Sequence, residues 1–90
     1  MTRAAPPEIL TKTTSGRTLL FTLETGNVIP PHRHPNAQVT IAILNGEVDV
    51  TTGNATRTLQ GGEVITHATD AEVSLHARQV SRVLVCLLNH

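Results

Sequence analysis

Residues 26–46 read GNVIPPHRHPNAQVTIAILNG and hold most of the information about the fold. The proline pair in this stretch excludes a helix, because proline lacks the backbone N–H that a helix interior needs. The segment Val39 to Leu44 then alternates with the period of two that is typical of a strand. Val39, Ile41 and Ile43 form the more uniformly apolar face, so we expect these three side chains to point into the core. Asn-Gly ends the stretch as a turn signal.

Short strands separated by turn signals continue on both sides of this stretch, and no helical period is visible. Ninety residues suffice for one domain. We expect an arm at 1–8 that is mobile or runs along a sheet edge, followed by a single domain at 9–90. About eight strands are expected, at 9–14, 17–24, 38–45, 47–52, 55–60, 63–67, 71–77 and 82–88. This pattern predicts an all-β sandwich or barrel.

The composition excludes several classes of partner. The formal net charge is zero, and basic residues are scattered without a stripe of stacking aromatics, so we expect no nucleic-acid binding. No apolar run is long enough to span a bilayer, and the first residues lack the apolar core of a secretory signal, so we expect a cytoplasmic protein without a membrane partner. Phe21 is the only aromatic, so a pocket would lack aromatic walls, and Cys86 is expected to be a small buried side chain.

His32 and His34 are the candidate site residues. They are separated by one residue on an extended stretch, so both imidazoles should face the same side, close enough to share a metal ion. Arg33 should point the other way.

This stretch resembles the first motif of the cupins, which runs G, five residues, HxH, three or four residues, E, six residues, G. Gly26, His32, His34 and Gly46 stand at the required spacing, but the glutamate position holds Val39. Gln38 lies one place early and would replace the glutamate only if a bulge turned it inward, whereas the strand alternation points it outward.

The second cupin motif is degenerate. Counted from Gly62, the positions of its proline, glycine, histidine and asparagine hold Ala68, Asp70, Val73 and Ala77. The resemblance covers residues 17–88 without a gap, and it implies a small single-domain cupin with a jelly-roll barrel.

Similar cupins hold Fe, Mn, Ni or Zn with three histidines and one glutamate. The resemblance therefore implies a divalent transition metal on His32 and His34, with Gln38, His67 or His76 as substitutes for the missing ligands. The alternation predicts that His76 is a surface residue and that His67 lies at the surface or rim, while His90 is expected to be disordered. Alternatively, His32 and His34 line the cavity without a metal.

We expect a protein that binds a small ligand or a divalent metal in the barrel through His32 and His34. A metal-dependent dioxygenase or isomerase and a metal-free structural or accessory protein are the alternatives. The run Val83 to Leu88 is apolar on both faces. Because one of those faces must point out of the barrel, we expect a homodimer that covers it.

Overall fold

The described residues form nine strands and no helix. The computed structural model describes residues 2–67 and 71–89, so Ala68, Asp70 and His90 lie outside the described residues. The strands are β1 (Glu8–Thr13), β2 (Gly16–Leu23), β3 (Val28–His32), β4 (Ala37–Asn45), β5 (Glu47–Thr52), β6 (Ala55–Gln60), β7 (Val64–His67), β8 (Val73–Ala77) and β9 (Ser81–Asn89).

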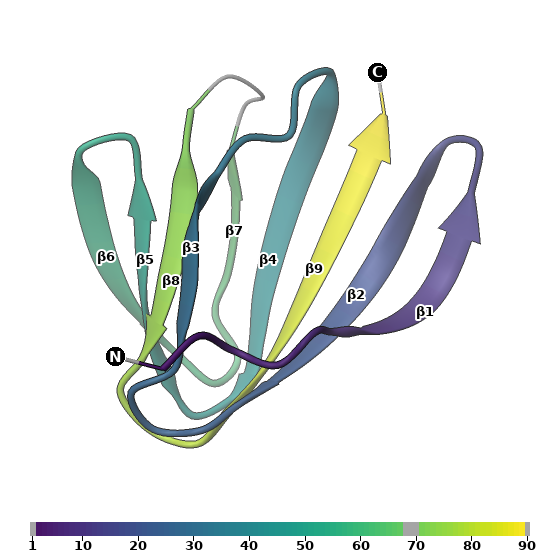
Figure 1. Cartoon of the computed structure of the whole chain (residues 1–90). Helices are drawn as coiled ribbons and strands as arrows, with labels where there is room; N and C mark the ends of the chain where they lie inside the picture. Colours follow the sequence, from purple (N-terminus) through teal and green to yellow (C-terminus); the bar gives the residue numbers. More distant parts are fainter. Residues whose placement is uncertain (1, 68–70, 90) are drawn as a thin grey trace.

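The strands form two antiparallel sheets that face each other (Figure 1). The larger sheet has the order β1-β2-β9-β4-β7, and the smaller has the order β3-β8-β5-β6. Five of these seven strand pairs join strands that are not consecutive in the sequence, as in a jelly roll. The expectation of an all-β, two-layered barrel is confirmed.

The core lies between the sheets and follows the alternation along each strand. In β4 the expected inward residues Val39, Ile41 and Ile43 are each only 1% exposed. The neighbouring strand β9 contributes Val85, which lies opposite Ile41, and Leu87, which lies opposite Val39. The inward orientation that the sequence predicts for β4 is therefore confirmed.

Strand β3 is the main element that the sequence pattern missed, because it contains Pro30 and Pro31. Proline cannot donate to a sheet ladder and is tolerated at edges and irregularities. β3 is an edge strand of its sheet, and its pairing with β8 shifts register between Ile29 and His32, where the prolines lie.

The N-terminal residues run along the other edge of β3. The Ala4 N–H donates to the Val28 carbonyl at 2.8 Å, and the Val28 N–H donates to the Thr2 carbonyl at 2.9 Å. Strand β1 then begins at Glu8 and pairs with β2. All six residues of β1 are exposed, since this strand projects past the smaller sheet (Figure 1).

The last strand, β9, is apolar on both faces, as its sequence indicates. Val83, Val85 and Leu87 are buried in the core, whereas Leu88 is 56% exposed on the outer face. Cys86 also lies on the outer face and is half-buried, which corrects the expectation of a buried thiol. No helix able to cross a membrane occurs in the described part of the chain.

Candidate functional site

The four positions that align with cupin metal ligands lie around one cavity. His32 ends β3, His34 follows in the loop to β4, and Val39 and Val73 come from β4 and β8. His32 is in register with Val73 across the β3–β8 pair. The remaining lining is apolar and comprises Leu19, Phe21, Ile29, Ile41, Leu75 and Val85. The fold thus places two imidazoles and two valines where a full ligand set would meet.

The cavity itself is nearly filled by these side chains. The space open to a water-sized sphere is only about 30 Å³, enough for one or two waters. Val39 and Val73 belong to this lining and are only 1% and 2% exposed. A molecule of metabolite size would therefore have to bind at the mouth and not inside the barrel.

The two imidazoles stand edge to face at the mouth. Their ring centroids are 4.5 Å apart, and the ring planes are perpendicular. His32 Nδ1 lies 2.7 Å from the Pro30 carbonyl oxygen. Because a carbonyl only accepts, this nitrogen carries the proton and donates it, and the lone pair of His32 is then on Nε2. Metal-binding histidines are commonly oriented by such a carbonyl.

The surroundings of His34 favour its neutral form. Burial lowers the pKa of His34 below its ordinary value of 6.5, and the nearby His32, Arg17 and His67 lower the pKa further. A neutral imidazole has a lone pair available at pH 7, which both metal binding and hydrogen-bond acceptance require.

His67 lies closer to this pair than the sequence indicates. In the β4–β7 ladder it is opposite Val39, so it shares the inward face of Val39. It is half-buried and contributes to the lowered pKa of His34. The pairing of β7 with β4 determines this position, and no local pattern in the sequence reveals that pairing.

Gln38 and His76 are not brought to the imidazole pair. The Gln38 amide donates from its Nε2 to the His67 carbonyl at 3.2 Å, and Gln38 has the opposite parity to the buried Val39. No bulge turns it inward, because the register shift in β4 lies between Ile43 and Asn45. Gln38 thus faces outward, as the strand alternation indicates.

His76 lies on the outer face of the smaller sheet, as expected. Its Nδ1 is 3.6 Å from Asp49 Oδ2, and its side chain is 40% exposed. Arg78 also donates from Nε to the Asp49 carboxylate at 2.9 Å. The pKa of Asp49 is lowered, mainly by a hydrogen bond from the Thr58 hydroxyl. This cluster is a surface ion-pair group, separate from the mouth.

The donor set at the mouth fits only part of a metal site. Within residues 2–67 and 71–89, no three His, Cys, Asp or Glu side chains lie together in a way that could hold an ion. Stable sites usually have three or four protein ligands. The chain offers His32 and His34, and water or a bound ligand would have to occupy the other positions.

Comparison with known proteins bears on the fold. A family model described as a cupin domain matches residues 19–79. An RmlC-like cupin protein from Desulfovibrio desulfuricans is similar with a TM-score of 0.86 and 23% identity, over 96% of this chain and 82% of that chain. A conserved protein of unknown function from Streptococcus pyogenes has a TM-score of 0.86 at 20% identity, over 93% and 73% of the two chains. KdgF from Halomonas sp. has a TM-score of 0.85 at 18% identity, over 93% and 79%. At these identities the likeness shows the fold alone, and no curated protein is significantly similar in sequence.

Proposed function

The chain belongs to the cupin domain family, and we propose that it is a binding protein in which His32 and His34 hold a divalent transition ion at the mouth of the barrel. The observation that carries this proposal is the imidazole pair itself. Its ring centroids are 4.5 Å apart, and the Pro30 carbonyl orients His32 so that Nε2 is the nitrogen with the lone pair. Zn, Ni, Mn or Fe would each accept imidazole nitrogen.

Binding is proposed in preference to catalysis because the site has few groups for proton transfer. None of the described residues that line the cavity is an acid, and the sequence contains no tyrosine. Two protein ligands also leave most positions around the ion open to water or to a small ligand. The site is therefore suited to weak, exchangeable binding.

The test is a metal-dependent shift in thermal stability. An ion that binds only the folded chain stabilises it by about 2.7 kcal/mol at 100 times its Kd, or roughly 10–20 °C for a domain of this size. We expect Zn, Ni or Co to raise the melting temperature of the parent protein. The double variant His32→Ala, His34→Ala should lose this rise, and the control His76→Ala should keep it. Absence of a shift in the parent protein would contradict metal binding and favour imidazoles that only line the cavity.

We also propose that the chain forms a homodimer through the outer face of the larger sheet. One apolar row crosses four strands of this face, because Leu20, Leu84, Ala42 and Val64 lie opposite one another in successive ladders. Val64 in this row is 59% exposed, and Leu88 on the same face is 56% exposed. Soluble monomers seldom expose a continuous apolar face of this kind.

The scarcity of charge on the part of this face formed by β2, β9, β4 and β7 favours a second copy as the partner, with Glu8 of β1 beside Leu20 at its edge. Among the described residues of β2, β9, β4 and β7 that point outward, only Arg82 is charged. Arg82 lies near one end of β9 and outside the apolar row. A twofold contact brings identical patches together. A face without charges in its centre can therefore meet itself without burying like charges.

The partner face can be located with two substitutions on β9. Leu84→Asp changes the outer face and should give a folded monomer, whereas Val85→Asp changes a side chain that is 7% exposed in the core and should give little soluble protein. Sedimentation equilibrium measures the oligomeric state. A parent chain that remains monomeric at high micromolar concentration would refute the dimer.

A further inference from the structure

A second hollow opens beside the barrel mouth, between the β1–β2 hairpin and the loop from β3 to β4. It has a volume of about 340 Å³, at the small end of the range for ligand pockets. Its lining comprises Lys12, Thr13, Gly16, Arg17, Arg33, His34, Pro35, Ala37, Leu87 and Asn89. Three cationic residues therefore line one concave site, together with apolar residues such as Ala37 and Leu87.

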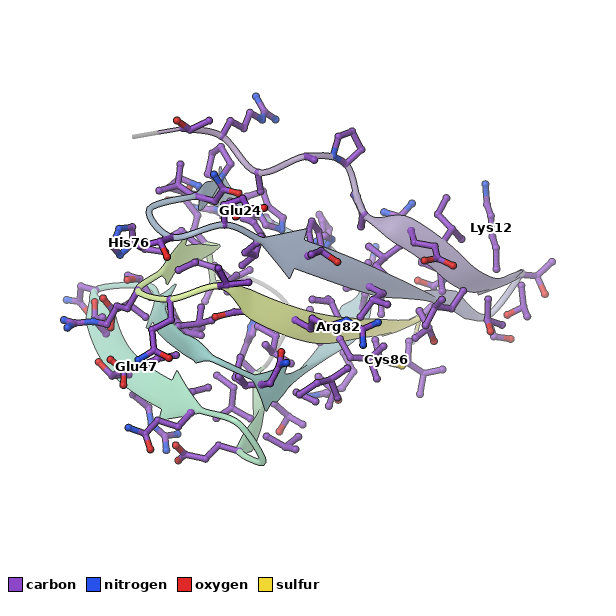
Figure 2. The ribbon with its side chains drawn as sticks, turned by 90° about the horizontal axis from the view of Figure 1, so that it is seen from below. Lys12, Glu24, Glu47, His76, Arg82 and Cys86 are labelled. Carbon is purple, nitrogen blue, oxygen red and sulfur yellow. The ribbon has the colours of Figure 1, made fainter. Side chains whose placement is uncertain are left out.

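These cations lack acidic partners within the described chain. The hollow has no carboxylate in its described lining, and both ion pairs found among residues 2–67 and 71–89 use Asp49 on the other sheet. Figure 2 shows Lys12 at one end of the molecule and Glu47 toward the other end. The positive charge at the hollow is thus not neutralised by a neighbouring described acid.

The register of the hairpin makes this arrangement costly. Lys12 and Arg17 are directly opposite each other in the β1–β2 ladder, and like charges in that position destabilise a strand pair. An anion between these side chains would turn the repulsion into attraction.

Both walls of the hollow are held in place by backbone contacts. The Asn89 N–H donates to the Ser15 carbonyl at 2.7 Å, and its side-chain amide donates to the Thr14 carbonyl at 3.3 Å, so the end of β9 anchors the hairpin. On the other side the Ala37 N–H donates to the His34 carbonyl at 3.2 Å and closes the loop. A site with fixed walls loses less conformational entropy when a ligand binds.

We propose that this hollow binds a small organic molecule through an oxyanion group, a phosphate or a carboxylate. Arg17 and Arg33 provide planar forks that match either oxyanion with paired hydrogen bonds, and Lys12 provides a third charge. Leu87 and Ala37 provide the apolar surface for the carbon portion. This proposal is independent of the metal proposal, because it rests on the three cationic residues and not on the imidazole pair.

The experiment measures anion binding by isothermal titration calorimetry in the presence of a chelator, so that no metal contributes. Inorganic phosphate and succinate are titrated separately at constant ionic strength. We expect saturable binding of at least one of them. Each of Arg17→Gln and Arg33→Gln should weaken it about tenfold or more, since a charge-assisted hydrogen bond is lost. Binding of phosphate alone or succinate alone identifies the preferred oxyanion.

Two controls separate this site from other effects. Arg82→Gln removes an exposed cation elsewhere and should leave the affinity unchanged, and His76→Ala removes a histidine on the outer face of the smaller sheet and should also leave it unchanged. In the absence of anions, Arg17→Gln should raise the melting temperature by relieving the repulsion with Lys12. Absence of saturable binding, or an equal loss in Arg82→Gln, would overturn the proposal.

Discussion

The pair of substitutions Val39→Glu and Val73→His should complete the metal site at the mouth. Both valines line the same cavity as His32 and His34, and Val73 lies in register with His32. If the two new side chains keep the inward directions of the valines, a carboxylate and a third imidazole would join the existing pair. Four protein ligands form a complete tetrahedral set for zinc.

The loss of stability expected without metal can be derived from the burial of these positions and from the free volume of the cavity. Val39 is 1% exposed, and an unpaired polar group there costs about 1–3 kcal/mol. The cavity offers only about 30 Å³ for the longer side chain, so crowding adds about 1–3 kcal/mol. For Val39→Glu alone the cost is about 2–6 kcal/mol, a large share of the 5–15 kcal/mol that stabilises a typical domain. The metal-free variant should therefore be close to unfolding.

Bound metal should offset much of this loss of stability. At an ion concentration about 1,000 times Kd the folded state gains about 4.1 kcal/mol, or roughly 15–30 °C in melting temperature. The assay is urea unfolding followed by circular dichroism, with and without Zn. The control Ile43→Glu places the same group on the same buried face, but about 13 Å further along the strand, where it cannot reach the ion. A folded double variant that Zn stabilises no more than the parent protein would refute the assigned register.

Three further predictions concern stability. Ser81 is fully buried, and its hydroxyl accepts from the Glu47 N–H at 3.1 Å and donates to a backbone carbonyl at 2.8 Å. Ser81→Ala should therefore lower the free energy of unfolding in urea by about 1–3 kcal/mol. A cost near zero would show that water replaces the hydroxyl. Gly46 has φ +96°, and a Cβ there would collide with the Ser81 hydroxyl, so Gly46→Ala should lower the melting temperature far more than Gly53→Ala, where a Cβ meets open space. In metal-free protein the pKa of His34 is lower in the folded chain than in the unfolded chain, so the unfolded chain takes up a proton more readily. The free energy of unfolding should therefore fall as the pH drops from about 7 through 6.5 towards the folded-state pKa. His34→Gln should flatten this profile in unfolding experiments at several pH values, and an unchanged slope would assign the effect to other groups.

Local patterns in the sequence were enough to predict the strand content and the inward face of β4. Val39, Ile41 and Ile43 alternate with polar or smaller residues, and each is buried as the period of two requires. The outward direction of Gln38 follows from the same alternation. These features depend only on backbone geometry and on the removal of apolar surface from water, both of which act between near neighbours in the sequence.

The composition of the site depended on pairings between distant strands. His67 lies near His34 because β7 pairs with β4, and β3 accommodates two prolines because it lies at an edge with an irregular register. Lys12, Arg17 and Arg33 line one hollow because a hairpin and a distant loop meet at the end of β9. Sheet order is decided by long-range packing of many similar apolar faces, so short sequence patterns do not encode it uniquely.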